Sequence, residues 1–381
     1  AVPWPWQEHF PEPPAATSVG TSVPARFGRR PHGGEAADAG HGAGHGQGHG
    51  AERQEAAAGA GPQARRHNSR GGSTPPLLQA GPTAAAAQRP LGPPPSSGRT
   101  ALLTSVASEP NAKFRPYMED VAVIVDPYQV TGDADDARWG YYAVYDGHGG
   151  RQAVDFCEAR FHGIVLDELR TSRSRPGAAP SDEAVADALT RAFKRMDDQL
   201  RLVGAWRCGC TATVVLVRRT PTALRLHVAN VGDSRCIVVD GSRCECRVSC
   251  DHRPTDISEI RRIEAEGGFV SRSRVAGQLG VSRALGDHAL KASGVSWRPH
   301  VHARDASRDA VVVIASDGLW DFMSDWDASH VVLRTMSEKT PEQAAQNLVD
   351  EGERRGSTDN ITCLVAYFDA ASAFTPLDRY H

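Results

Sequence analysis

The stretch TVVLVRRTPTALRLHVANVGDSRCIVVD, residues 213–240, contains three apolar runs with no helical segment between them. The runs at 213–217, 224–230 and 236–240 have the length and the branched side chains of β-strands. Connections of five or six residues separate the runs, and such short connections are typical of antiparallel neighbours in a sheet. This stretch therefore predicts consecutive antiparallel strands rather than alternating strand–helix–strand units.

The segments on either side group strands with strands and helices with helices. Further strands are predicted at 121–125, 141–145, 310–315 and 361–368. Helices are predicted at 151–169, from the N-cap Ser181, at 256–266, near Asp325 and from Thr340, where Thr340 and Gln343 are expected to form a capping box around Pro341. The chain is therefore predicted to have an α+β fold.

Composition divides the chain near residue 100. Residues 1–100 hold 15 of the 25 prolines and 17 of the 37 glycines, but only eight Val, Ile, Leu, Met or Phe residues. So few apolar side chains cannot offset a backbone entropy loss of roughly 1–2 kcal/mol per residue on folding. We expect a disordered region at 1–100, one large folded domain at 101–370 and a short tail at 371–381.

The charge of the folded part argues against a nucleic-acid partner. Residues 101–381 carry 34 basic and 40 acidic residues, a net charge of −6 that is unsuited to binding a phosphate backbone. No apolar run approaches the roughly 20 residues of a membrane-spanning helix, and the amino terminus shows no secretion signal. We therefore expect no membrane span and an intracellular location, in the cytoplasm, the nucleus or both.

Acidic residues recur where a predicted strand meets a glycine or another small residue. They are Glu119 and Asp120, Asp146, Asp233, Asp317 and Asp359. For any one of these positions alone, ordinary turn chemistry is the simpler explanation. Their recurrence within one domain favours a site for Mg²⁺ or Mn²⁺, because these cations prefer carboxylate oxygens.

Cysteine and histidine offer weaker metal sites. The cysteines at 208 and 210 and at 244, 246 and 250 lack the two-residue spacing usual for structural zinc, so buried or strand-borne free thiols are favoured. Eight cysteines in 381 residues also do not suggest a secreted disulfide scaffold. In the N-terminal region, His41, His45 and His49 are separated by glycines, which give no fixed ligand geometry, so a flexible tail is the simpler interpretation.

Two further residues have side chains suited to proton transfer and to anion binding. His148 lies two residues after Asp146, and a histidine can protonate a leaving group near neutral pH. Its alternative role is to hold the turn. Arg115 stands four residues before Glu119, and its guanidinium matches phosphate oxygens in a bidentate manner. Its alternative role is that of a solvated surface charge.

Short motifs follow one another along residues 101–370 in a characteristic order. They are RPYMED at 115–120, DGHGG at 146–150, CGCTA at 208–212, GDSR at 232–235, DHRP at 251–254, LGVSRALGD at 279–287, SDGLWD at 316–321 and DN at 359–360. This combination resembles the metal-dependent protein phosphatases of type 2C, the PPM family. The chain departs from the family's pattern in lacking the usual Gln-Gly before the first motif and in having Cys210 for a serine or threonine. Neither change removes a ligand.

The resemblance implies a role for each candidate residue. Asp146 would bridge two Mn²⁺ or Mg²⁺ ions, the Gly147 carbonyl would bind one, and Asp317 and Asp359 would bind the other. Glu119 and Asp120 would act mainly through metal-bound waters, and Asp233 would contribute to a third, weaker ion. Arg115 would hold the substrate phosphate, and His148 would be the general acid.

The family fold would be a four-layer sandwich of two antiparallel β-sheets flanked by α-helices on both faces. The function implied is hydrolysis of phosphoserine and phosphothreonine in protein substrates, through a hydroxide that bridges the two ions, by a monomeric enzyme. Two alternatives stay open: a catalytically silent phosphoprotein-binding module of the same fold, and a phosphatase acting on small phosphate esters.

Overall fold

The computed structural model describes residues 98–130, 137–172, 179–239, 245–307 and 310–368. The disordered region expected at 1–100 and the tail expected at 371–381 lie almost wholly outside these ranges, so both stay predictions. The described part contains two large antiparallel sheets and six α-helices. None of the helices in these ranges has the length and apolar character needed to cross a membrane.

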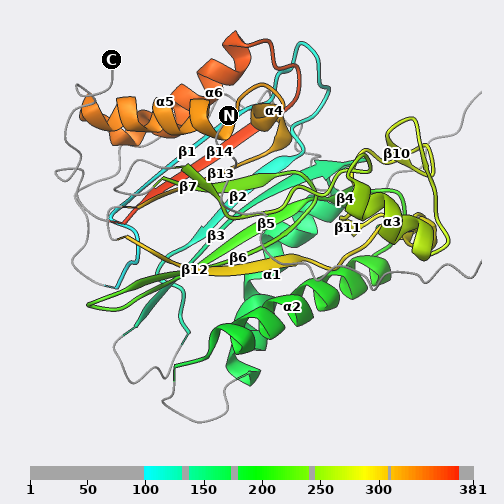
Figure 1. Cartoon of the computed structure of the whole chain (residues 1–381), viewed down its shortest axis with the longest axis horizontal. Helices are drawn as coiled ribbons and strands as arrows, with labels where there is room; N and C mark the ends of the chain where they lie inside the picture. The colour runs from blue at the N-terminus through cyan, green and yellow to red at the C-terminus, as the bar shows by residue number, and fades with distance from the viewer. Residues whose placement is uncertain (1–97, 131–136, 173–178, 240–244, 308–309, 369–381) are drawn as a thin grey trace, which may run out of the picture. The chain divides into compact units, whose positions relative to one another are not determined.

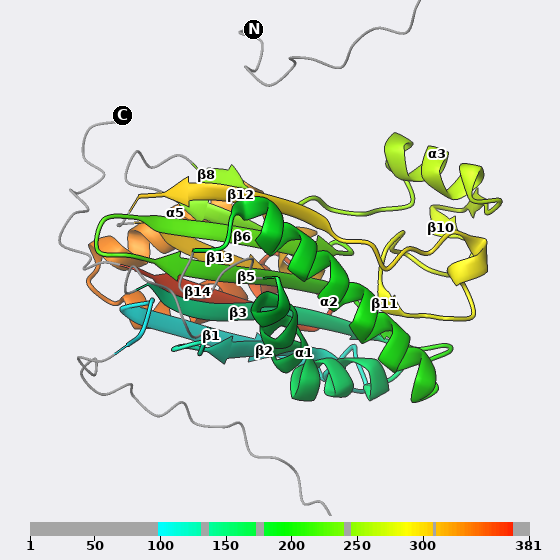
Figure 2. The ribbon, with the colours of Figure 1, turned by 90° about the horizontal axis from the view of Figure 1, so that it is seen from below.

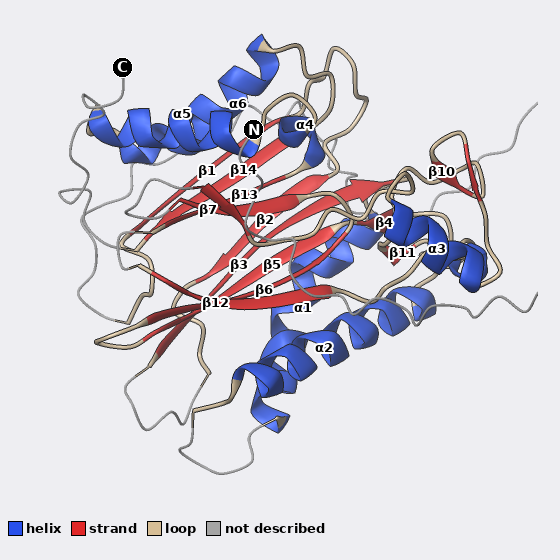
Figure 3. Ribbon diagram, viewed as in Figure 1, coloured by secondary structure: helices blue, strands red, loops and turns tan. Residues whose placement is uncertain are grey.

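One sheet has seven strands and the other has five (Figure 3). The seven-stranded sheet runs in the order β11 (Leu285–Gly286), β4 (Gly209–Cys210), β3 (Arg138–His148), β5 (Ala212–Arg219), β6 (Leu224–Val231) and β12 (His300–Ala306), and β2 (Asp120–Val125) pairs with β3 beside this path. The five-stranded sheet runs in the order β1 (Leu103–Glu109), β14 (Ile361–Tyr367), β13 (Val311–Ala315), β7 (Arg235–Val239) and β8 (Glu245–Arg247). A small hairpin joins β9 (Val270–Ser271) and β10 (Arg274–Val275).

Helices cover the outer face of each sheet. The long helices α1 (Gln152–Thr171) and α2 (Asp182–Leu202) lie across the seven-stranded sheet (Figure 2). The five-stranded sheet is covered by α5 (Asp325–Ser337) and α6 (Ala344–Arg354), as Figure 1 shows. The remaining helices are the short α3 (Ile257–Ala265) and the single turn α4 (Asp317–Trp320). The expected four-layer sandwich is therefore confirmed.

Side-chain alternation along β3 shows how the layers hold together. Tyr141, Ala143 and Tyr145 are buried against α1 and α2, whereas Tyr142 and Val144 are buried between the two sheets. Successive residues of a strand point to opposite faces. A strand in this position must therefore be apolar throughout, which explains the unbroken run at 141–145.

One topological expectation is wrong. The runs at 224–230 and 236–240 were expected to pair, but β6 lies between β5 and β12, while β7 lies in the other sheet between β13 and β8. The connection turns at Gly232, whose φ is +89° and where an added Cβ would lie 2.5 Å from Thr211 Cγ2. A short connection fixes only that two strand ends are close, and ends in facing sheets about 10 Å apart satisfy it too.

Local expectations hold for one helix start and fail for another. Ser181 caps α2 by accepting a hydrogen bond from Ala184 N at 3.2 Å, as expected. Thr340 makes no side-chain cap: residues 341–343 form a 3₁₀ turn, and α6 begins only at Ala344. The capping box is found instead at the start of α5, where Ser324 and Asp327 bond reciprocally.

Candidate active site

The candidate carboxylates meet at one end of the sandwich. Asp120 begins β2 directly opposite Asp146 in β3. Asp317 is the first residue of α4, immediately after β13 and Ser316, and Asp359 lies two residues before β14. Asp233 lies in the connection that passes from β6 to β7. The two sheets therefore both contribute side chains to the same place.

Burial and mutual repulsion raise the pKa values of this cluster. Burial is the largest cause of a pKa for Asp146 well above its usual value, and the nearby charges of Asp120, Asp317, Asp233 and Asp359 raise it further. Burial also raises the pKa of Asp317 to about 6, of Asp120 to about 7 and of Asp233 to about 8. The carboxylates of this cluster repel one another, and the positive charge beside them is too small to offset the repulsion.

Hydrogen bonds fix the strand ends that carry these groups. Ser316 Oγ donates to Asp120 Oδ2 at 2.7 Å. Asn360 holds two segments together, because its Oδ1 accepts from Glu119 N at 2.8 Å and its Nδ2 donates to Pro110 O at 2.7 Å. Glu119 Oε1 in turn accepts from Gly150 N at 2.7 Å, while Glu119 O accepts from Gly147 N at 3.0 Å. The motifs at 115–120, 146–150 and 359–360 are thus parts of one network.

Gly318 allows the closest backbone approach in this network. An added Cβ would lie 2.0 Å from the carbonyl oxygen of Asn360. Gly318→Ala is therefore expected to lower the free energy of unfolding by about 1–3 kcal/mol, since the overpacked segments must move apart. The loss would be measured by urea denaturation monitored by circular dichroism.

Gly163→Ala is the matched control. Gly163 lies within α1 and an added Cβ there would have no neighbour within 4 Å. Alanine in place of glycine within a helix is expected to stabilise the fold by about 0.5–1 kcal/mol. Equal effects of the two substitutions would show that the approach of Gly318 to Asn360 is not tight.

Two arginines pair with carboxylates of the cluster. Arg115, in the loop before β2, forms an ion pair with Asp359, although its side chain is 47% exposed. Arg253 lies 3.4 Å from Asp233 and 2.5 Å from Asp321, measured from Nη2 to the nearest carboxylate oxygen. Arg115 therefore lies where a phosphate group next to Asp359 would meet it.

His148 has a specific partner. Its Nε2 lies 2.6 Å from Oδ2 of the buried Asp287. Burial lowers the pKa of His148, but the hydrogen bond and the charge of Asp287 outweigh it, and the pKa is raised above the usual value. Gly209 makes room for this pair, since an added Cβ would lie 2.1 Å from Asp287 Oδ2. His148 is thus held in place and biased toward its protonated form.

The donor set fits hard divalent cations. Every candidate side-chain ligand offers oxygen, which Mg²⁺ and Mn²⁺ prefer, and the repulsion that raises the pKa values would be relieved by a bound cation. Among the residues that the structure describes, no three acidic, histidine or cysteine side chains are arranged as a ready-made ligand group. The carboxylates instead bond to Ser316, Arg115 and Arg253.

Sequence reasoning gave no role to Asp287 or Asn360. Asp287 lies within the quoted LGVSRALGD motif, and its φ of +50° in the sequence Gly-Asp-His marks an unusual backbone position. Asn360 follows Asp359 directly, so its contacts to Glu119 and Pro110 depend on chain segments about 240 residues away. The spacing of residues along the chain could not reveal the contact of Asp287 with His148 or the contacts of Asn360.

The cysteine expectation holds in part. Cys157, Cys208, Cys210, Cys236 and Cys363 are buried free thiols, and Cys246 lies in β8. Cys250 is exposed and lies outside the strands, so it is neither buried nor strand-borne as expected. Cys244 lies outside the described residues. No cysteine side chain takes part in the hydrogen bonds and ion pairs that surround Asp146 in the described residues.

Comparisons with known proteins point to one family. Residues 104–361 match the family described as Protein phosphatase 2C. The chain is 35% identical over 267 residues to "Protein phosphatase 2C homolog 1" of Schizosaccharomyces pombe, which covers 69% of this chain and 72% of that protein. It is 34% identical over 275 residues to the protein of the same name from Saccharomyces cerevisiae, which covers 69% of this chain and 92% of that protein.

Solved structures show the same fold. A serine-threonine phosphatase 2C from Toxoplasma gondii superposes with a TM-score of 0.57 at 23% identity, over 73% of this chain and 98% of that one. A sex-determining protein of Caenorhabditis elegans superposes with a TM-score of 0.61 at 23% identity, over 72% of this chain and 66% of that one. At this identity the likeness concerns the fold alone.

Proposed function

This chain belongs to the protein phosphatase 2C family of metal-dependent serine/threonine protein phosphatases, and we propose that the carboxylate cluster around Asp146 is its active site. The observation that carries the proposal is the convergence of four acidic side chains on Asp146 beside the His148–Asp287 pair. A phosphoserine or phosphothreonine in a protein is the substrate that this arrangement supports.

We propose that the site holds two ions, either Mn²⁺ or Mg²⁺. Asp146, the Gly147 carbonyl, Asp317 and Asp359 would be their ligands, with Glu119 and Asp120 in support and Asp233 contributing to a third, weaker ion. When bound, divalent cations lower the pKa of water and stabilise negative charge on phosphate oxygens. The raised pKa values of Asp120, Asp146, Asp233 and Asp317 support this assignment, since a bound cation would favour the ionised carboxylates against burial and mutual repulsion.

His148 is proposed to supply the proton to the leaving oxygen. With Nε2 bonded to Asp287, the second ring nitrogen, Nδ1, is left to carry the proton, and it has no hydrogen-bond partner among the described residues. The raised pKa favours the protonated ring, as a general acid requires. Asp287 is therefore a positioning residue that acts through His148.

Arg115 is proposed to bind the substrate phosphate. Its guanidinium is half-exposed and already pairs with the Asp359 carboxylate. A phosphate offers several oxygens and more charge than a carboxylate, so the same guanidinium can bind it in a bidentate manner. Arg115 would then stabilise charge on the phosphate oxygens during hydrolysis.

The proposal is tested by assaying the full chain on four substrates: a phosphoserine peptide, a phosphothreonine peptide, a phosphotyrosine peptide and a small alkyl phosphate. We expect Mn²⁺-dependent release of phosphate from the first two, much slower release from the others, and complete loss of release with EDTA. Preference for the small ester would favour the small-molecule alternative. Phosphopeptide binding without turnover would favour the silent module, and EDTA-resistant turnover would contradict the metal site.

The general-acid role predicts a dependence on the leaving group. His148→Gln and Asp287→Asn are each expected to lower kcat for a phosphoserine peptide by about 100-fold, because an alkoxide leaves poorly without a proton. Both should lower kcat for p-nitrophenyl phosphate far less, since its leaving group departs readily as an anion. Steady-state kinetics on the two substrates measures the difference.

His300→Gln is the matched control for these variants. His300 is an exposed histidine at the start of β12, away from the His148–Asp287 pair. Its substitution should leave both substrates unaffected. Equal losses on the peptide and the aryl phosphate in His148→Gln would assign His148 to phosphate or metal binding instead of proton transfer.

We also propose that the enzyme works inside the cell, in the cytoplasm, the nucleus or both, and as a monomer. The seven described cysteines are all free thiols, which suits a reducing compartment. A single chain supplies all the carboxylates around Asp146, so the site needs no residue from a second copy. Fractionation and sedimentation of the full chain would test the two parts of this proposal.

A further inference from the structure

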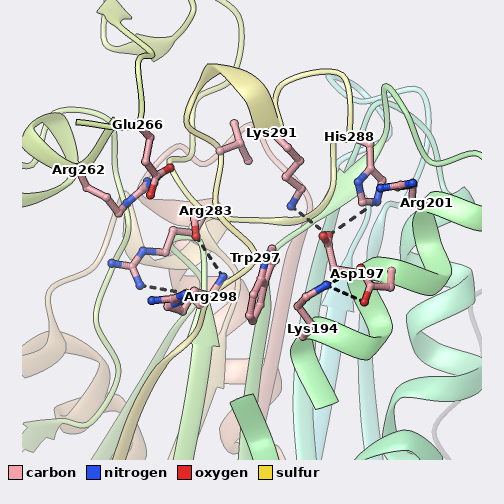
Figure 4. Close-up of a pocket in the computed structure, with 13 residues that line it drawn as sticks. Lys194, Asp197, Arg201, Arg262, Glu266, Arg283, His288, Lys291, Trp297 and Arg298 are labelled. Carbon is pink, nitrogen blue, oxygen red and sulfur yellow. Dashed lines mark hydrogen bonds and ion pairs between the residues drawn. The ribbon is translucent and has the colours of Figure 1, made fainter. Parts of the chain in front are cut away.

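A second pocket lies apart from the carboxylate cluster. Its volume is about 540 Å³, and it is bounded by α2, α3 and the segment 283–298 (Figure 4). Six lining residues are basic and three are acidic. The basic residues are Lys194, Arg201, Arg262, Arg283, Lys291 and Arg298, and the acidic residues are Asp197, Asp198 and Glu266. A cationic pocket stands out in a folded region with a net charge of −6.

Two of these cations have no counter-charge. Lys194 pairs with Asp198, Lys291 with Asp197, and both Arg262 and Arg283 bond to the buried Glu259 behind the pocket. Arg201 and Arg298 are exposed, and neither guanidinium has a hydrogen bond or an ion pair to another described residue. Their donors are therefore available to a ligand at the pocket.

An aromatic surface lies beside Arg298, one of the two unpaired arginines. Trp297 lines the pocket and is half-buried. Lys194 Nζ lies 5.6 Å from the centre of its ring, and the Arg298 guanidinium carbon lies 5.8 Å from it. Figure 4 shows Trp297 between Lys194 and Arg298. The pocket thus offers an apolar face for a peptide chain next to donors for an anion.

The wall between this pocket and the catalytic groove is thin. Asp287 and Leu290 line the groove that also contains His148, whereas His288 and Lys291 line the cationic pocket. Neighbouring residues of one short segment therefore line the two sites. A single stretch of chain with its side chains is on the order of 10 Å thick, which an extended peptide crosses in about three residues.

We propose that this pocket binds a second phosphate group of the protein substrate, carried on a residue near the one that is cleaved. The inference rests on the proposed function, which supplies a phosphorylated protein as substrate. A cavity of about 540 Å³ greatly exceeds a free phosphate ion and suits a short peptide segment that carries one. The guanidinium of Arg298, which lies beside Trp297, would bind the phosphate oxygens, and Arg201 across the pocket would add positive charge. Trp297 would contact the neighbouring chain.

The test compares peptides with one cleavable phosphoserine and a second position at varied distance. The second position holds either serine or a non-hydrolysable phosphonate analogue, with spacers of two to eight residues, so that only one phosphate can be released. We expect the phosphonate to lower KM roughly tenfold at spacers of about three residues or more, as one charge-assisted contact would, with kcat unchanged. Phosphate release by the full chain with Mn²⁺ is the measurement.

Variants locate the effect. R201A/R298A is expected to abolish the advantage of the phosphonate peptide, and R201E/R298E to reverse it, while both leave the serine peptide within about twofold of the unmodified protein. Arg261→Ala is the matched control, because Arg261 is an exposed arginine of α3 that does not line the pocket. It should keep the full advantage.

The outcomes separate this inference from the proposed function. If the serine peptide is turned over but no spacer gives an advantage, or the advantage survives R201A/R298A, the pocket is not a phosphate site and the proposed function stands. If the phosphonate only inhibits, it binds at the catalytic site and the inference is overturned. If the serine peptide is not turned over at all, the proposed function fails and this inference falls with it.

Discussion

Asp146→Asn is expected to abolish turnover and at the same time to stabilise the metal-free protein. Loss of the central carboxylate should lower kcat by about a thousandfold or more with Mn²⁺ present, since Asp146 is the proposed ligand on which the other carboxylates converge and none of them can take its place. The same change replaces a buried carboxyl group, whose ionisation is opposed by burial and by four neighbouring carboxylates, with a neutral amide. In EDTA at pH 8 the melting temperature should rise by roughly 2–4 °C, which corresponds to about 1 kcal/mol for a domain of this size.

Asp187→Asn is the control for both measurements. Asp187 is an exposed residue of α2 outside the cluster. Its substitution should change neither kcat nor the melting temperature. A lower melting temperature for metal-free Asp146→Asn would mean that the carboxylate is not destabilising in the fold, and near-normal turnover would remove Asp146 from the metal site.

The stability of the metal-free protein is expected to fall as the pH rises from 5 to 8. The pKa values of Asp317, Asp120 and Asp233 are raised to about 6, about 7 and about 8, above the value of 3.8 for a free aspartate. The unfolded chain has released these protons by pH 5, whereas the folded chain still holds them. Raising the pH from 5 up to the folded values therefore costs stability, by several kcal/mol in total.

Mn²⁺ should cancel this loss. A cation that binds only the folded state stabilises it in proportion to the logarithm of its concentration over Kd, and it binds the deprotonated cluster best. Thermal melts with and without Mn²⁺ should thus diverge at pH 8 and nearly coincide at pH 5. Sodium chloride at matched ionic strength is the control. Equal shifts with both salts, or a Mn²⁺ effect that does not depend on pH, would contradict a carboxylate site.

Local sequence patterns were sufficient to predict the strands that lie in the core. The run at 141–145 is apolar on both faces because β3 is buried on both, so its strand character is visible without its neighbours. β1 and β12 were not predicted, because they lie at sheet edges where polar residues are tolerated, as in HVHARDA at 300–306. Their pairing is decided by the strands beside them.

The candidate site was predictable as a list of residues and not as an arrangement. Strand-end carboxylates and the quoted motifs pointed to Asp146, Asp317 and Asp359 from sequence alone. Their arrangement depends on the passage from β6 to β7 between the sheets, which the length of the connection at 231–235 could not reveal. The pairing of His148 with Asp287 spans 139 residues and depends on the same long-range assembly.

The two-sheet origin of the cluster has a consequence for substitutions far from it. The side chains between the sheets, among them Val144, Val238 and Leu364, set the spacing of the layers. The ends of those layers hold Asp146 on one sheet and Asp317 on the other, so a change of sheet spacing becomes a change in the distance between ligands. Conservative substitutions of side chains between the sheets should therefore change the affinity for the metal, although they alter no residue of the site.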